Sequence, residues 1–324
     1  AGAEKNRELD EAFALLKERN APSDRVEYLR ALQLFEQKDW VAAATALGDV
    51  RERFINDPQV SLPLNSMLAI CYGHLGNRDL QLQALQRTKE LAPLNPRVRF
   101  QLASALTLAN RIDDAANELS QVSLRHEGAA TVAAELLMRR QLQRPQPQRK
   151  WSDTVETMQN TLLTNLEKID RKFSNDWTAV KITMARAYNN QATDLAGTVP
   201  QKANESLDQS EQLLSAAISE QPDEPQYWTE LSNVRFLRGT LANDETEQKK
   251  LQKDALETLD QAEAALGRQA IFLAARARGL GIIHANDDDR SEILKQVNAL
   301  ANDTDDMSDA DKIVLYKALG SANL

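Results

Sequence analysis

The sequence has few cysteine, glycine, proline and aromatic residues, and each shortage restricts the fold. A single cysteine, Cys71, in 324 residues excludes an intramolecular disulfide framework. Only 11 glycines and 10 prolines interrupt the chain, which leaves room for long helices. Aromatic residues make up 5% of the chain although 42% is hydrophobic, a balance that favours helices packed through alanine and leucine over an aromatic-rich β-sheet core. We therefore expect an all-α protein.

The sequence also lacks long apolar runs and an excess of positive charge. No run is long enough to cross a bilayer, and the first residues do not resemble an intact signal peptide. The formal charge is -9, which argues against nucleic acid as the main partner because phosphate binding needs a net basic face. We expect a soluble chain without a membrane span. A cytoplasmic location is slightly favoured, and an exported mature chain is the alternative, because the sequence starts without methionine.

Motifs for catalysis and metal binding are missing as well. The sequence contains no Walker-type glycine loop, and its histidines, His74, His126 and His284, are far apart and form no His-Glu-x-x-His pair. The acidic run 303–308 begins like a calcium loop but lacks the turn glycine and the closing glutamate. Gly279 and its neighbours fit close helix packing better than a nucleotide-binding loop. We predict a protein that is not an enzyme and that uses no cofactor or metal.

Two stretches that start at Leu62 and Pro96 repeat the same pattern in phase, with a period of about 34 residues. Each has a large, a small and a large apolar residue on one helical face, then a turn, then a second helical pattern. The matching residues are Leu68, Ala69, Tyr72 and the turn Gly76-Asn77 in the first stretch, and Leu102, Ala103, Leu106 and the turn Asn110-Arg111 in the second.

These residues resemble the tetratricopeptide repeat family, whose unit is a helix A, a turn and a helix B. In that family, small residues midway along helix A and early in helix B let the two helices approach closely. Ala69 and Ala103 match the first position and Ala115 matches the second, whereas Gln81 departs from the pattern. A further block covers about 24–57. The resemblance implies an all-α fold, a right-handed α-α superhelix of tetratricopeptide-like helix-turn-helix repeats.

The pattern changes along the chain, and we divide it accordingly. Prolines in the connection 144–148 replace a tight turn, and the later helix pairs have longer connections. The expected parts are a leading capping helix (1–23), three repeats (24–129), an irregular helical pair with a proline-containing connection (130–175), helix pairs with extended loops (176–302) and a C-terminal capping helix (303–324).

The resemblance implies a concave groove lined by the A helices, which would bind a peptide or protein segment. Asparagine side chains can bond a peptide backbone, arginines its carboxylates and aromatic rings its side chains. The alternative is that Phe35 and Phe100 only seal neighbouring helices. The inward-facing candidates are Arg25, Tyr28, Phe35, His74, Arg97, Phe100, Ser104, Arg186, Asn189, Asn190, Asn233 and Phe236.

One subtype of the family does not fit. Chaperone-binding members have a lysine and asparagine clamp for a terminal carboxylate. The residues at the matching positions do not reproduce it: Arg25, Tyr28, Leu32, Ser66 and Ile70.

We predict a non-enzymatic scaffold for protein–protein interaction, with a protein or peptide as partner. One alternative is a regulatory module that contacts nucleic acid through the basic stretch 139–150, which carries five positive charges without an intervening acid. That stretch can equally be a solvated linker. Another alternative is the helical auxiliary region of a larger enzyme or of an envelope-assembly protein.

Overall fold

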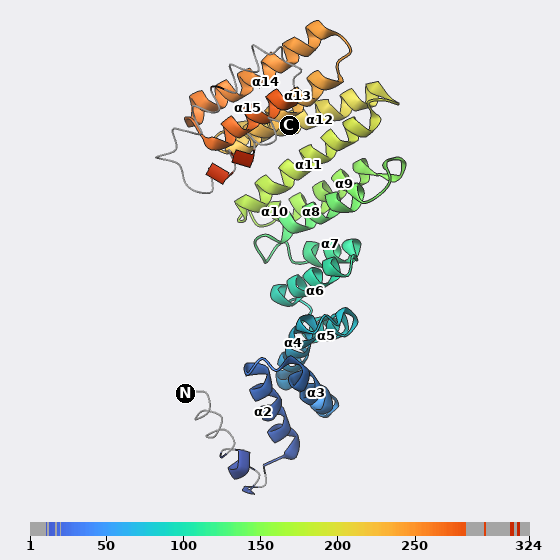
Figure 1. Cartoon of the computed structure of the whole chain (residues 1–324), viewed down its shortest axis with the longest axis vertical. Coiled ribbons are helices and arrows are strands. Elements are labelled where there is room, and N and C mark those ends of the chain that lie inside the picture. Colours follow the sequence, from blue (N-terminus) through green and yellow to red (C-terminus); the bar gives the residue numbers. More distant parts are fainter. Residues whose placement is uncertain are drawn as a thin grey trace. The chain divides into compact units, whose positions relative to one another are not determined.

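The computed structural model describes residues 21–282 continuously, together with residues 11, 13–16, 18–19, 295, 312–313 and 316–317. Every regular element in this part of the chain is a helix (Figure 1). The chain divides into two compact units, 1–136 and 137–324, and the division falls within α8 (Ala129–Leu142). The all-α prediction is confirmed. Most of the leading helix, the segment around His284, the acidic run 303–308 and most of the C-terminal helix lie outside the described residues.

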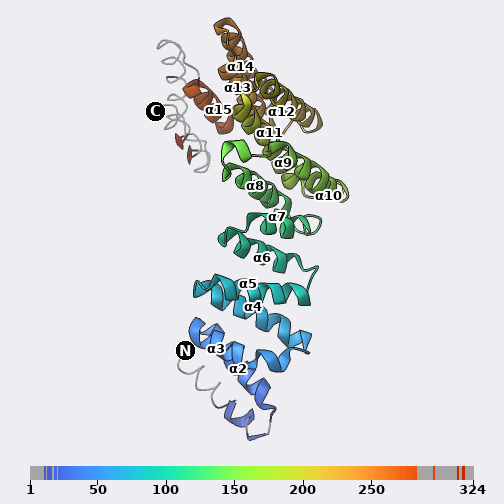
Figure 2. The same cartoon turned by 90° about the vertical axis from the view of Figure 1, so that its right-hand side faces the viewer.

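The first unit consists of helix pairs that follow one another along the chain (Figures 1 and 2). Within each pair, helix A packs against helix B, and helix B packs against the next helix A. A short 3-10 helix, η1 (Glu52–Phe54), follows the first pair. The pairs are α2 (Ser23–Glu36) with α3 (Trp40–Arg51), α4 (Pro58–His74) with α5 (Arg78–Leu91), and α6 (Pro96–Leu108) with α7 (Ile112–Ser120).

The turns inside these pairs have the same geometry. Lys38, Gly76 and Asn110 have φ angles of 61°, 71° and 59°. In each turn the next residue donates its backbone N–H to the carbonyl oxygen five positions earlier: Asp39 to Leu34 at 3.1 Å, Asn77 to Tyr72 at 2.9 Å and Arg111 to Leu106 at 2.8 Å. A left-handed residue with this hydrogen bond is a common way to end a helix. Its recurrence confirms the tetratricopeptide-like repeat.

Small residues at the predicted positions allow the helices of a pair to approach. Ala69, Ala103 and Ala115 are buried. Where Gln81 replaces the small residue of helix B, the facing residue of helix A is Gly73, and a Cβ there would lie 2.7 Å from Gln81 Nε2. The departure at Gln81 is therefore compensated within its own helix pair.

The second unit begins with an irregular pair. After α8, the connection forms a short 3-10 helix, η2 (Gln146–Gln148), and the next helix contains a π-helical segment. This helix ends at Glu167, before the end of the irregular pair that we expected over 130–175. Asp170 and Arg171 have positive φ angles, and Arg171 donates its N–H to Leu166 O at 3.0 Å, which closes the helix. Its parts are α9 (Trp151–Thr157), η3 (Met158–Leu163) and α10 (Thr164–Glu167).

Three of the following helices are longer than any helix of the first unit: α11 (Ser174–Leu195), α12 (Pro200–Glu220) and α14 (Glu245–Leu266). The others are α13 (Pro225–Leu241), which is as long as α4, and α15 (Ala270–Ile282). Their connections at 196–199 and 242–244 are short, unlike the extended loops that we expected within 176–302. Gly239 is buried inside α13, where a Cβ would be 3.5 Å from Gln248 O of α14. The additional residues therefore lengthen the helices rather than the loops.

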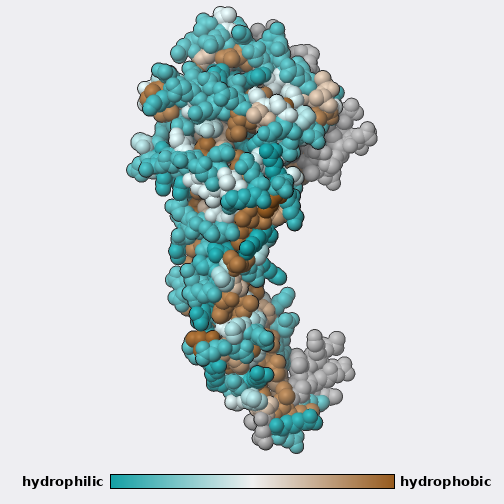
Figure 3. Space-filling view, turned by 180° about the vertical axis from the view of Figure 1, so that it is seen from behind, coloured by the Kyte–Doolittle hydropathy of each residue, from teal (hydrophilic) through white to brown (hydrophobic). Residues whose placement is uncertain are grey.

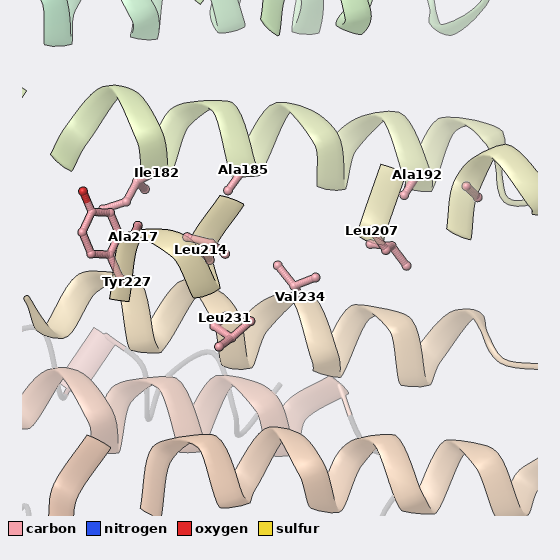
Figure 4. Close-up of a cluster of buried hydrophobic side chains, with 10 residues drawn as sticks. Ile182, Ala185, Ala192, Leu207, Leu214, Ala217, Tyr227, Leu231 and Val234 are labelled. Atoms are coloured by element: carbon pink, nitrogen blue, oxygen red, sulfur yellow. The ribbon is translucent and has the colours of Figure 1, made fainter. Parts of the chain in front are cut away.

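The core of the second unit lies between α11, α12 and α13 (Figure 4). The ring of Tyr227 is fully buried beside Ile182 and Ala217. Gly279 of α15 faces the ring of Phe236 of α13, and a Cβ at Gly279 would overlap that ring. The prediction that Gly279 serves close helix packing is therefore confirmed.

Candidate functional site

The candidate site in the first unit is the face of α2, α4 and α6 that the repeat pattern assigns to the groove, which we call the A-helix face. None of its residues is buried, whereas Leu68 and Leu102 on the same helices belong to the core. The A-helix face comprises Arg25, Tyr28, Leu32 and Phe35 on α2, Ser66, Ile70, Gly73 and His74 on α4, and Arg97, Phe100, Ser104 and Thr107 on α6.

Three aromatic side chains contact one another in sequence at one end of this face. The ring of Phe35 contacts Trp40 edge-on, with centroids 5.6 Å apart. Trp40 in turn stacks on His74, with centroids 4.1 Å apart. Trp40 was not among the predicted groove residues, because it opens the helix B of the first pair, α3. The aromatic residue Phe35, close to the same turn, could have indicated that an aromatic cluster forms there.

The other predicted aromatic residues also have partners within the chain. Tyr28 packs against Phe54 with ring centroids 5.6 Å apart, and burial raises the pKa of the Tyr28 hydroxyl. Phe100 packs against His126 at 4.8 Å. The rings of Tyr28 and Phe100 remain half-buried. They therefore pack against neighbouring elements and also contribute part of their surface to the A-helix face.

Aliphatic side chains are exposed along the same face. Ile70 has 38% and Leu108 has 62% of its surface exposed. Leu108 follows Ser104 by one helical turn and corresponds to His74 in the repeat, so the period could have identified it, and we add it to the A-helix face. Figure 3 shows brown apolar side chains at the surface in the lower half of the view, where Figure 1 places α2 to α7.

In the second unit, several predicted polar residues already have partners within the chain, mainly Glu230. Two guanidinium nitrogens of Arg186 contact Glu230 Oε1, and Asn233 Nδ2 donates to Glu230 Oε2 at 3.4 Å. Asn190 Nδ2 donates to the carbonyl oxygen of Arg186 at 2.9 Å. Because Glu230 already balances its charge, Arg186 is poorly suited to bind a partner's carboxylate.

Two other predicted residues of this unit are not at an open surface. Phe236 is 1% exposed and packs beneath Gly279, so it belongs to the core and we remove it from the candidate site. Asn189 is half-buried, and its Oδ1 accepts no hydrogen bond from the described part of the chain.

Part of the basic stretch 139–150 is engaged by contacts within the chain. Arg149 forms a 2.9 Å ion pair with Asp194 of α11. Lys150 lies 3.9 Å from Asp153, and Arg144 contacts Gln141 Oε1 at 3.5 Å.

Within the described residues, no cluster of histidine, cysteine, aspartate and glutamate is arranged to hold a metal ion. Cys71 is buried without a disulfide partner, and burial raises the pKa of its thiol. Among these residues, every helix is too short or too polar to cross a membrane.

Comparison with known proteins found no matching family model and no matching curated protein. Solved structures do match. A tetratricopeptide repeat protein from Parabacteroides merdae is 13% identical, with 93% of this chain and 99% of that chain covered and a TM-score of 0.39. Yeast Tom70 is 15% identical, with 93% and 62% covered and a TM-score of 0.32. Human IFIT1, solved as a dimer with PPP-AAAA, is 15% identical, with 99% and 77% covered and a TM-score of 0.32. All three TM-scores are low, so our description of the fold depends on the helix pairs and turns of this chain.

Proposed function

We propose that this chain is a non-enzymatic scaffold for protein–protein interaction, and that the A-helix face of the first unit binds a segment of a partner protein. The observation that carries this proposal is the exposure of the face. Every position that the repeat pattern assigned to it is accessible, although the same three helices bury residues on their other sides.

The side chains of the face indicate the kind of segment that fits. Ile70 and Leu108 supply exposed apolar surface, and Arg25 and Arg97 supply positive charge. None of the residues of the face is acidic, in a chain with 48 acidic residues. A segment with apolar side chains and flanking carboxylates complements this surface, because apolar contacts supply affinity and opposite charges supply orientation.

The alternatives receive less support from specific contacts. A nucleic-acid module would need a strongly basic surface at 139–150, but Arg149 is paired with Asp194 and the chain carries a formal charge of -9. An auxiliary region of a larger enzyme or of an envelope-assembly protein would still act through a binding face, so that alternative differs in context rather than in mechanism.

Site-specific photo-crosslinking tests the proposal. A photoreactive amino acid is placed at Ile70 or Leu108 in the full chain, and at Val41 as a matched control. Val41 is also apolar and is 63% exposed, but it lies on helix B of the first pair. We expect one partner to be cross-linked from positions 70 and 108 and not from position 41. The yield should fall when Arg97→Glu is added, because the reversed charge repels the partner's carboxylates.

Equal cross-linking of the same partner from all three positions would overturn the assignment of the A-helix face. If the yield is unchanged in the Arg97→Glu variant, the apolar contact at positions 70 and 108 still holds. The partner's carboxylates would then not bind Arg97.

A further inference from the structure

Two cavities in the second unit are lined in part by the connection between α8 and α9. One, of about 600 Å³, has three cationic side chains among its lining residues and is called the cationic cavity: Arg140, Gln141, Arg144, Gln148, Lys150 and Asp153. The other, of about 630 Å³, includes Trp151, Leu195 and Pro147 in its lining and is called the indole cavity. Lys150 and Asp153 line both cavities, so a single short ligand can reach from one into the other.

The segment 146–151, which contributes to the lining of both cavities, is tied to α11 by hydrogen bonds. Asp194 accepts hydrogen bonds from Trp151 Nε1 at 2.7 Å and from Arg149 at 2.9 Å, and its carbonyl oxygen accepts one from Gln146 Nε2 at 2.9 Å. Two prolines in 145–147 fix their own φ angles. A wall fixed in this way is preorganised, which lowers the entropy lost when a ligand binds.

The cations of this region differ in how firmly they are engaged. Arg149, which lines the indole cavity, is fixed by Asp194. Lys150 is paired only loosely with Asp153, at 3.9 Å between exposed groups, a geometry that contributes little stability. Arg144 has no carboxylate within ion-pair distance among the described residues, and its guanidinium contacts the neutral amide of Gln141. Arg144 and Lys150 can therefore turn to an incoming anion.

The indole cavity offers a different environment. Trp151 is buried, with its Nε1 occupied by Asp194, and its ring, Leu195 and Pro147 provide apolar surface. Gln191 and Ser152 are hydrogen-bonded to each other at 3.0 Å and contribute polar groups to the lining. Eight of its eleven lining residues are polar, and the other three, Pro147, Trp151 and Leu195, form the patch against which an apolar side chain can pack.

We propose that these two cavities together bind a short peptide segment in which a carboxylate stands next to a large apolar side chain. Arg144 and Lys150 hold the carboxylate, and the indole cavity takes the apolar side chain. A single carboxylate fits a small cluster of cations, whereas nucleic acid would bring many phosphates toward a chain with a net charge of -9. This site lies in the second unit and does not depend on the A-helix face of the first.

The probe is a phage-displayed library of random hexapeptides, selected on the full-length chain and counter-selected on its Arg144→Gln variant. The enriched peptides are then synthesised with a fluorescent label, together with versions in which the acid is replaced by its amide. We expect the enriched sequences to place aspartate or glutamate beside a large apolar residue. Arg144→Gln, Lys150→Gln and the acid-to-amide replacement should each weaken binding about tenfold or more, because each removes a charge-assisted hydrogen bond.

Lys249→Gln serves as the matched control, since Lys249 is an exposed lysine on α14, far along the chain from this site, and its partner is the exposed Glu245. It should leave binding unchanged. Circular dichroism shows whether Arg144→Gln alters the fold. Lys150→Gln changes an exposed side chain, so it tests the site even if Arg144→Gln does alter the fold.

Three results would overturn the proposal. One is the absence of enriched peptides, or enrichment without the acidic and apolar pair. Another is equal affinity for the unchanged chain and for Lys150→Gln. The last is a labelled mixed-sequence oligonucleotide that binds the chain and displaces the peptides, which would assign the cations to nucleic acid instead.

Discussion

The imidazole ring of His74 lies flat on the indole ring of Trp40, with the centroids 4.1 Å apart and the ring planes 6° apart. His74 ends α4 and Trp40 begins α3, so the contact joins two consecutive helix pairs. Stacked aromatic pairs contribute stability beyond the area that they bury. The stack therefore supports the A-helix face as well as forming part of it.

We expect His74→Ala to lower the free energy of unfolding by about 0.5–1.5 kcal/mol, because it removes this stack. His74→Phe should retain most of it. A double-mutant cycle with Trp40→Ala, measured by urea denaturation and circular dichroism, gives the coupling energy directly. Additive effects of the two substitutions would show that the stack contributes no stability.

The close approach of Gly279 to Phe236 leads to a second prediction. Gly279→Ala should destabilise the second unit by about 1–3 kcal/mol, because the added methyl group overlaps a buried ring that cannot move aside. Gly48→Ala is the matched control. Gly48 also lies in a helix, α3, and a Cβ there meets no atom within 4 Å, so this change should stabilise by about 0.5–1 kcal/mol through helix propensity. Thermal unfolding of the two variants should shift in opposite directions, and a shift in the same direction would contradict the packing argument.

A third prediction concerns the carboxylate of Glu118 on α7. Its two oxygens bind Lys89 of α5 at 2.7 Å and Arg99 of α6 at 2.6 Å, and only 11% of the side chain is exposed. Glu118→Gln should cost about 2–4 kcal/mol, because two largely buried cations lose their counter-charge. Arg87→Gln breaks the exposed pair with Glu90 and should cost less than about 0.5 kcal/mol. Urea denaturation compares the two, and similar losses would mean that burial does not strengthen the Glu118 contacts.

The sequence predicted the repeat well where its information is local. The turns at Lys38, Gly76 and Asn110 need a left-handed residue at a fixed point, and the small residues of each pair follow from the same period. The compensation between Gly73 and Gln81 could not be predicted, because each residue taken alone departs from the pattern and only their contact explains both.

The exposure of the candidate residues was predictable in the first unit and not in the second. On α4 and α6, exposure follows helical spacing, so the period placed Ile70, Arg97 and Ser104 correctly at the surface. In the second unit, exposure depends on which helix covers which. Phe236 is buried because α15 packs over it, and Arg186 is neutralised by Glu230 from a different helix. Both facts depend on contacts between residues that are distant in sequence.

A final prediction follows from the burial of Tyr227 in the core of the second unit. Burial, partly offset by a hydrogen bond from Thr178, raises the pKa of the Tyr227 hydroxyl from 10.0 to about 12. Because the folded pKa is higher than the unfolded one, the neutral hydroxyl contributes its full stability below pH 10.0, and this contribution is lost as the pH rises through about 12. The total loss is about 2–3 kcal/mol.

Tyr227→Phe removes this titration and should therefore make the free energy of unfolding less dependent on pH in the alkaline range. Denaturation at a series of pH values compares the variant with the unchanged chain, and the ultraviolet absorbance of tyrosinate shows whether ionisation accompanies unfolding. Tyr72→Phe is the matched control, since Tyr72 is half-buried in the first unit and should leave the alkaline slope of the second unit unchanged. If Tyr227→Phe and the unchanged chain lose stability equally between pH 10.0 and about 12, the buried hydroxyl is not the group that titrates.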